Sequence, residues 1–449
     1  MDPTPVRMRR EHERIRAHLY DTILPFWLQN SPDYEFGGFY SCFDNTTHEL
    51  VSTRKFLWAQ GRMLWLMSEL YAYDRHTRWA ELAGMGQRFI VQRAFDRRHH
   101  CYFSVDRQGR PSADETATLY GGTFADCFVV LGLSAYARVF ADPTSREHAL
   151  AVFRTIRDRF TAGLFNSYPY PVPNGLDSHG VHMMIAVCGA ELLAALKALP
   201  APEGSQSRRR GEHELCHSAA AMVAEEVRNH LRRLYARFRS AAGPLREYAP
   251  GCGEQARPTD RGPNVANSIL LSYHNPGHSL ETFSLVHEQQ SLLQGGLWSR
   301  TELVSAVLAT LECGWDRDYG GLFTFVAPGR DLERFVAADD PLGSETMVTK
   351  VARDWSHKLW WPHAEAMYTA LALGLAYDSQ PLLAWYSRIR SYALATFPSV
   401  DGREWVQIRD RFGKPLDAVV ALPVKDPYHI PRCLIKCLQA IERAESGSA

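Results

Sequence analysis

The sequence has no surplus of charge of either sign and no long apolar run near its start. Lys plus Arg number 50 and Asp plus Glu also number 50, in a chain of 449 residues. Because such a balance creates no strong global field, it argues against nucleic acid, an anionic membrane or a polyanionic substrate as the partner. We therefore expect a compact, neutral small molecule as the ligand.

Several sequence signals that would define a compartment or a cofactor are also absent. The nine cysteines show no Cys-x-x-Cys pair or zinc spacing, and their odd number argues against the disulfide framework of a secreted protein. The N-terminus mixes charges of both signs without a signal-length apolar core, and no later run approaches a membrane span. A Walker-type loop and a dinucleotide-binding glycine motif are both missing, which removes the usual supports for phosphoryl and hydride transfer. We expect a soluble, cytoplasmic protein with reduced thiols.

Helical periodicity dominates what is present. Hydrophobic residues make up 45% of the chain, enough for a large core in several domains or in one toroid. Apolar residues recur with helical spacing in nine segments, and several of these have clear helix-start signals. The predicted helices span residues 10–27, 56–73, 142–160, 182–199, 213–238, 301–314, 362–377, 379–397 and 431–444.

Six short segments rich in glycine and aromatic residues separate these helices and resemble one another. They are residues 36–40, 101–105, 163–168, 243–248, 319–325 and 402–408. They recur roughly every 65 to 80 residues, which leaves room for a helix pair between neighbours. This regularity predicts an all-α fold, a single (α/α)6 barrel over residues 1–449 with short β-hairpins in the inter-helix loops. The polar tract at about 200–214 is predicted to be an exposed loop.

Residues 273–281 read Tyr-His-Asn-Pro-Gly-His-Ser-Leu-Glu and form a predicted helix start. Asn275 can cap, Pro276 fits the first helical position, and His278 then lies in the first turn. The positive end of the helix dipole disfavours a protonated imidazole, so we expect His278 to stay neutral and able to accept a proton. Glu281 lies on the same helical face and could orient the ring. A structural histidine that only caps and packs remains the alternative.

Other candidate residues lie at further helix starts. The internal helices of a toroid run parallel, so their N-termini open at one mouth. His182 and His429 precede apolar runs of this kind, and the segment Lys-Leu-Trp-Trp-Pro-His-Ala-Glu adds an aromatic pair. Aromatic faces stack on the C–H surface of a sugar, while its hydroxyls need fixed donors and acceptors. The candidate substrate-binding residues are His182, Trp58, Tyr120, Trp360, Trp361, His363 and Glu365.

Each candidate also has a structural interpretation. Arg62 lies in a very apolar predicted helix, where it either faces the central cavity or pairs with an internal carboxylate. One of Trp360 and Trp361 is expected in the core, and at most one of His363 and Glu365 can line the site because they point to different sides of a helix. The His278-x-x-Glu281 spacing can bind metal, but no second pair matches it, so we expect no metal.

Four motifs together carry a family resemblance. They are Trp58-Ala-Gln-Gly-Arg62, the segment 275–281, the segment 358–367 and the Pro-Tyr-His-Ile-Pro-Arg-Cys-Leu run at 427–434. In this order the chain resembles the N-acylglucosamine 2-epimerase family, which also includes cellobiose 2-epimerases and mannose-type aldose–ketose isomerases. The resemblance covers nearly the whole chain, and the last two motifs are closest to the N-acetylglucosamine branch.

The resemblance implies an (α/α)6 barrel and catalysis without an obligatory metal or redox cofactor. It places the catalytic histidines on His278 and His429, an arginine near the first two sugar carbons on Arg62, and the acid that supports the first histidine on Glu281. His182 falls on a position that is histidine in the isomerase and cellobiose branches, within a different local pattern. The resemblance further implies a homodimer and activation by ATP in some members, although the sequence shows no nucleotide site.

These residues suit a cofactor-independent 2-epimerase that interconverts N-acylglucosamine and N-acylmannosamine. Two histidines on opposite sides of the sugar would exchange the C2 proton through a cis-enediolate, with Arg62 stabilising the oxyanion. An aldose–ketose isomerase or a cellobiose-type 2-epimerase would use the same residues. The more distant alternatives are an (α/α)6 glycoside hydrolase, with Glu281 opposed to Asp354 or Glu365, and a non-catalytic binding protein.

Overall fold

The inner layer of the fold consists of helices whose side chains are buried on most faces. The computed structural model describes residues 5–111, 122–164, 167–168, 170–198, 207–241, 243–251, 266–293, 297–420 and 422–447. Each inner helix contacts the next, and the last contacts the first, which closes the ring. The inner helices are α3 (Leu57–Asp74), α5 (Thr123–Phe140), α7 (His179–Lys197), α9 (Pro276–Glu288), α12 (Trp360–Ala376) and α14 (His429–Glu445).

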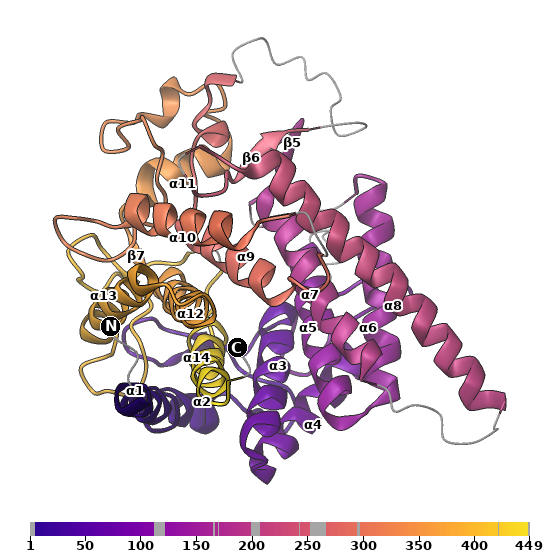
Figure 1. Ribbon diagram of the computed structural model, residues 1–449. Coiled ribbons are helices and arrows are strands. Elements are labelled where there is room, and N and C mark those ends of the chain that lie inside the picture. Colours follow the sequence, from indigo (N-terminus) through magenta and orange to yellow (C-terminus); the bar gives the residue numbers. More distant parts are fainter. Residues whose placement is uncertain are drawn as a thin grey trace.

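A second layer of helices surrounds this ring (Figure 1). Each of these outer helices precedes an inner helix in the chain, and its apolar stripe packs inward. They are α1 (Pro5–Ala17) with α2 (Leu24–Asn30), α4 (Thr77–Arg93), α6 (Pro143–Thr161), α8 (Ser207–Arg233), α10 (Arg300–Gly314) and α13 (Gln380–Thr396). The arrangement confirms the predicted (α/α)6 barrel.

The chain repeats one turn after several outer helices. Isolated bridges close this turn between Pro32 and Phe39, Phe95 and Cys101, Trp315 and Leu322, and Pro398 and Trp405. Four of the glycine- and aromatic-rich segments from the sequence therefore occupy equivalent places. Two of these turns also have equivalent buried ion pairs. Lys55 Nζ lies 2.9 Å from Asp33 in the first turn, and Lys358 Nζ lies 3.1 Å from Asp316 in the turn after α10.

The strands pair loops that are distant in the chain. Only β1 (Cys42–Phe43) and β2 (Leu50–Ser52) form a local hairpin among the described strands. The other antiparallel pairs are β3 (Lys55–Phe56) with β4 (Ser104–Val105), β5 (Leu176–Ser178) with β6 (Tyr248–Pro250), and β7 (Lys358–Leu359) with β8 (Ile408–Arg409). The prediction of hairpins was wrong for these three, since each strand pairs with the loop of another repeat. β3, β5 and β7 lead directly into inner helices, so this pairing ties the helix starts together.

Two further predictions need correction. Residues 200–206 of the predicted polar loop lie outside the described residues, but α8 already begins at Ser207, so residues 207–214 are helical. The arginine and glutamate residues of this stretch favour helix despite its polarity. A short helix, α11 (Thr346–Asp354), forms within the segment between α10 and α12, where the sequence analysis predicted none.

The inner helices α5 and α7 are long and apolar enough to cross a membrane by length and composition alone, which the sequence analysis did not anticipate. In the barrel, however, 72% of the apolar window of α5 and 83% of that of α7 are buried. Central helices of a toroid are packed on all sides, so they acquire this hydropathy from the core.

Candidate active site

The mouth of the ring contains a cavity of about 330 Å³, which we name the central cavity. Inner-helix starts and the loops that precede them form its wall. Seven predicted residues line this cavity: Trp58, Arg62, His278, Glu281, Trp360, Trp361 and His429. The structure therefore brings together all four predicted catalytic residues, which come from α3, α9 and α14.

The start of α9 holds His278 as the sequence predicts. The Asn275 side chain caps the helix by accepting from the backbone N–H groups of Gly277, at 3.0 Å, and His278, at 3.3 Å. Pro276 occupies the first helical position. The imidazole then faces the central cavity from the first turn.

Glu247, and not Glu281, orients the His278 ring. His278 Nδ1 donates to Glu247 Oε2 at 2.8 Å, and the second oxygen of the same carboxylate accepts from His179 Nδ1 at 3.1 Å. His179 Nε2 in turn accepts from the Thr282 hydroxyl at 2.8 Å. Glu247 is buried just before β6, so this chain of hydrogen bonds fixes the tautomer and leaves His278 Nε2 for the cavity.

The prediction that His278 stays neutral was wrong in direction. Burial lowers the pKa of His278, but the Glu247 carboxylate outweighs burial and raises it above the usual value. The pKa of Glu247 itself is held well below its usual range, where the two neighbouring imidazoles outweigh burial. A full negative charge in hydrogen-bond contact exceeds the partial charge of a helix end, so His278 is suited to carry a proton.

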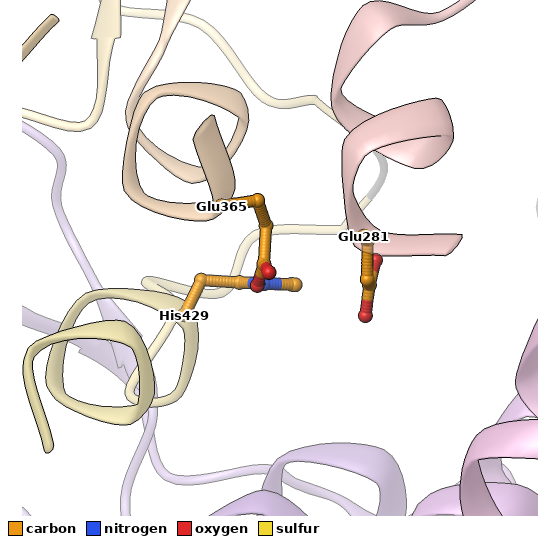
Figure 2. A group of neighbouring side chains, drawn as sticks. All are labelled: Glu281, Glu365 and His429. Carbon is orange, nitrogen blue, oxygen red and sulfur yellow. The ribbon is translucent and has the colours of Figure 1, made fainter. Parts of the chain in front are cut away.

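His429 at the start of α14 has a matching carboxylate partner. Its Nδ1 donates to Glu365 Oε1 at 2.7 Å, and Arg432 NH1 lies 2.8 and 2.7 Å from the two Glu365 oxygens. Burial raises the pKa of Glu365, but Arg432 outweighs it and lowers the value to about 2. Glu365 is thus an ionised residue behind His429 and does not itself line the cavity. Figure 2 shows this pair with Glu281 across from it.

Arg62 lies on α3 and does not use all of its N–H groups in hydrogen bonds to the described residues. Its NH1 donates to Asp426 at 2.7 Å and its NH2 lies 3.4 Å from His429 Nε2, while its buried Nε has no hydrogen-bond partner among the described residues. The guanidinium lies over Trp58, at 4.4 Å, and Phe128, at 4.1 Å. Arg62 therefore both pairs with an internal carboxylate and faces the cavity.

Trp360 and Trp361 divide their roles as the sequence suggested. Trp360 is packed in the core and donates from its indole nitrogen to Asp426 at 2.9 Å. Trp361 is only partly buried, and its ring centroid lies 5.0 Å from that of His278 and 5.6 Å from that of His429. Gly277 allows this approach, because a Cβ there would lie 2.5 Å from the Trp361 ring. Trp361 thus forms an aromatic wall shared by both histidines.

His182 does not reach the central cavity, which corrects its predicted role. It is fully buried, with Nε2 2.8 Å from Asp177 and Nδ1 2.7 Å from His230 Nδ1. Because α7 begins at His179, helical spacing turns Gly180, Met183 and Met184 toward the cavity and His182 away from it. An apolar wall therefore stands at that place.

The remaining predicted substrate-binding residues give two outcomes. His363 is fully buried, where its Nδ1 donates to the Leu359 carbonyl at 2.6 Å and its Nε2 accepts from the Leu322 N–H at 2.8 Å. Burial lowers its pKa to about 3, so it is a neutral core residue and not a substrate ligand. Tyr120 lies outside the described residues.

Glu281, Glu365 and His429 form a cluster whose potential ligand atoms all lie within 4.8 Å of one another. Such a set could hold a metal ion, but Arg432 already occupies both oxygens of Glu365. Burial and the nearby Glu365 charge raise the pKa of Glu281. The cluster is therefore better suited to hold and move a proton than to bind a second cation.

Sequence reasoning missed Glu247, Asp426 and Arg432. Glu247 lies in the segment 243–248 that the repeat analysis identified, and the available signal was that it is the one carboxylate of that segment. Asp426 immediately precedes the motif at 427–434 and accepts from the His429 N–H at 3.0 Å. Arg432 lies within that motif, three residues after His429, and so on the same face of α14.

Comparisons with known proteins identify the family. The sequence pattern of the family described as N-acylglucosamine 2-epimerase (GlcNAc 2-epimerase) matches residues 38–170 and 253–433. The chain is 26% identical to the N-acylglucosamine 2-epimerase of Bos taurus, over 98% of this chain and 95% of that protein.

Solved structures share the fold. The cellobiose 2-epimerase from Spirochaeta thermophila superposes with a TM-score of 0.72 at 20% identity, covering 98% of this chain and 99% of that one. A D-mannose isomerase superposes with a TM-score of 0.66 at 16% identity, covering 95% and 97% of the two chains. With its sequence match, closed helical ring and paired histidines, the chain belongs to the N-acylglucosamine 2-epimerase family.

Proposed function

We propose that this protein interconverts N-acylglucosamine and N-acylmannosamine by proton transfer at C2. The observation that carries the proposal is the pair of imidazoles at the starts of α9 and α14, each with Nδ1 bonded to a buried carboxylate. Both rings contact Trp361, and both residues line the central cavity. Two imidazoles held in this way can serve opposite faces of one carbon.

The proposed exchange needs one histidine protonated and the other neutral when the sugar binds. Glu247 raises the pKa of His278 and so favours its protonated form. His429 Nε2 accepts from Arg62, so in its neutral form the proton is on Nδ1, which donates to Glu365. In one direction, His429 removes the C2 proton and His278 delivers a proton to the opposite face. The reverse direction exchanges these roles.

Arg62 stabilises the enediolate between these steps. The open-chain sugar places its carbonyl oxygen near the guanidinium of Arg62, which lines the central cavity. Negative charge that develops on this oxygen is met by a fixed cation, in the manner of an oxyanion hole. Glu281, whose pKa is raised, can donate a hydrogen bond to a sugar oxygen beside His429.

The cavity wall supports an N-acylated substrate. Met183 and Met184 on α7 and Phe124 and Phe128 on α5 line the central cavity with apolar surface. The methyl group of an acetamido substituent would gain free energy when it leaves water and packs against this wall. A free 2-hydroxyl would lose its hydrogen bonds to water, and these four side chains offer it no strong donor in return. The carboxylates expected for a hydrolase do not stand opposed here, since Glu365 is bound to Arg432 and Asp354 does not line the central cavity.

We propose further that catalysis needs no metal or redox cofactor and that the protein is a cytoplasmic homodimer. Imidazole, carboxylate and guanidinium groups supply every proton and charge that the reaction requires. The eight cysteines that the structure describes are free thiols, which suits a reducing compartment. Activation by ATP is the family expectation, and the dimer and the nucleotide effect are tested by light scattering and by turnover with and without ATP.

The test is an NMR screen of N-acetylglucosamine, N-acetylmannosamine, mannose, glucose and cellobiose. We expect C2 inversion of the two N-acetylated sugars and none, or far slower turnover, of the others. His278→Ala and His429→Ala should each abolish turnover while circular dichroism shows an intact fold. Conversion of mannose to a ketose at a higher rate than N-acetyl sugar turnover would replace the epimerase assignment with an isomerase.

A further inference from the structure

A second cavity, of about 380 Å³, adjoins the central cavity and has no part in the proposed reaction. One side of this cavity is formed by α11 and the turn that follows that helix. Side chains of the segment 416–420 form the other side. The two cavities share four lining residues, which are Thr324, Lys350, Leu359 and Val420. A ligand in the second cavity would therefore touch the wall of the central cavity.

The polar groups of the second cavity carry more positive than negative charge. Asp354 is its only lining carboxylate among the described residues, and it accepts from Lys350 Nζ at 3.0 Å and from Arg353 Nε at 2.6 Å and NH2 at 2.8 Å. His357 Nδ1 lies 3.8 Å from the same carboxylate. Burial raises the pKa of Asp354, but Arg353 and Lys350 outweigh it and lower the value, so the carboxylate is ionised. One anion therefore faces two permanent cations.

Lys350 is the more buried of the two cations, and its ammonium also lies 5.0 Å from the centroid of the Tyr170 ring. The residue is 7% exposed, and its ammonium also donates to the Val420 carbonyl at 2.8 Å. These two bonds leave a third N–H for a further acceptor, and burying a cation without full compensation is costly. Apart from Thr324 and His357, the rest of the wall is aliphatic and includes Leu359, Ile408, Leu416 and Val420.

We propose that the second cavity binds a small organic anion, a carboxylate or a phosphate monoester on an apolar or ring frame. The surplus of one positive charge suits a ligand with one or two negative charges, and the aliphatic wall suits its frame. The Val420 carbonyl is held by Lys350 together with the Tyr170 hydroxyl at 2.6 Å. An anion that accepts the third N–H of Lys350 draws the ammonium toward itself and lengthens its bond to the Val420 carbonyl at the wall of the central cavity, so the bound anion raises KM for the sugar.

The experiment compares ligands of one shape and different charge on the full chain. Cyclohexanecarboxylate, cyclohexyl phosphate and the neutral cyclohexanecarboxamide are titrated by calorimetry. We expect at least one anion to bind roughly tenfold tighter than the amide, as for charge-assisted hydrogen bonds. The same anion should raise KM for the sugar.

Two arginine variants test whether the anion binds in the second cavity. Arg353 lines only the second cavity, and its side chain is 65% exposed, so Arg353→Gln should leave turnover without the anion unchanged and weaken anion binding roughly tenfold. Arg228→Gln is the matched control, since Arg228 on α8 makes the same two bonds to Glu225, at 3.0 and 2.6 Å. Equal binding of the amide and both anions would overturn the proposal. So would an equal effect of both arginine variants, or anion inhibition of the sugar reaction that Arg353→Gln leaves unaltered.

Discussion

Glu247→Gln tests the carboxylate that sets the protonation state of His278. The amide keeps the shape of the side chain and can still accept from His278 Nδ1, which lies 2.8 Å from Oε2 in the native protein. It removes the negative charge that raises the pKa of His278 against the effect of burial. A hydrogen bond to a charged group contributes roughly 1.5–3 kcal/mol, and one pKa unit corresponds to about 1.4 kcal/mol. We therefore expect the pKa of His278 to fall by roughly 1–2 units.

The sign of the pH effect follows from the role of His278 as the protonated partner. In the native enzyme the raised pKa keeps the imidazolium present at higher pH, so kcat/KM declines only on the alkaline side of that pKa. In Glu247→Gln the alkaline limb should move to lower pH by the same roughly 1–2 units, and at a given pH on that limb the rate should fall roughly tenfold to a hundredfold.

The assay is the pH profile of kcat/KM for both reaction directions. Glu281→Gln is the comparison variant, because Glu281 also raises the pKa of His278 but makes a smaller contribution than Glu247. Its alkaline limb should move less than that of Glu247→Gln, whatever its effect on the rate. A Glu247→Gln profile with the native alkaline limb would refute the argument that Glu247 controls His278.

Three other substitutions have defined outcomes. Gly277→Ala places a Cβ 2.5 Å from the Trp361 ring, so it should cost roughly 1–3 kcal/mol in urea unfolding and lower kcat. The nearest contact of a Cβ at Gly180 is 3.9 Å away, so Gly180→Ala should not destabilise the fold, and an equal loss of stability in both variants would contradict this packing. Asp316→Ala leaves Lys358 and Arg411 without their buried carboxylate and should lower the free energy of unfolding by roughly 3–5 kcal/mol. The exposed Asp318→Ala should lower it by less than about 1 kcal/mol. A smaller loss for Asp316→Ala than for Asp318→Ala would contradict the role of the buried ion pairs. Met184→Gln puts an amide into the apolar wall and should lower kcat/KM for N-acetylglucosamine roughly tenfold, and an unchanged value would place the acyl group elsewhere.

The repeat pattern was sufficient to predict the ring because each unit must bury its apolar face against the next. Spacing between aromatic and glycine-rich segments showed where helix pairs fit, although α4 and α5 were not among the predicted helices. The start signals of Asn275 and Pro276 located α9 itself. Strand pairing could not be read in the same way. β5 and β6 come from loops separated by two helices, and nothing local to Leu176–Ser178 records which loop lies beside it.

Site residues could be predicted where their positions depend on a helix start or on spacing within one helix. They could not be predicted where a hydrogen-bond partner comes from another loop. His278 and Glu281 share α9, so their spacing suggested a contact, yet the barrel brings Glu247 from the neighbouring loop to the ring nitrogen. For His182 the prediction depended on where α7 begins. A start at His179 turns Met183 and Met184 inward and leaves His182 to Asp177 and His230.

The central claim, proton exchange between two histidines on opposite faces of C2, is tested most directly by the first turnovers in D2O. N-acetylglucosamine is converted to a few per cent, and the C2 hydrogen of product and of remaining substrate is read by NMR or mass spectrometry. Two bases predict product that carries deuterium at C2 and substrate that still carries protium, because the proton returned comes from a histidine equilibrated with solvent. Product that retains protium at C2 would show return of the same proton by one base and would contradict the account.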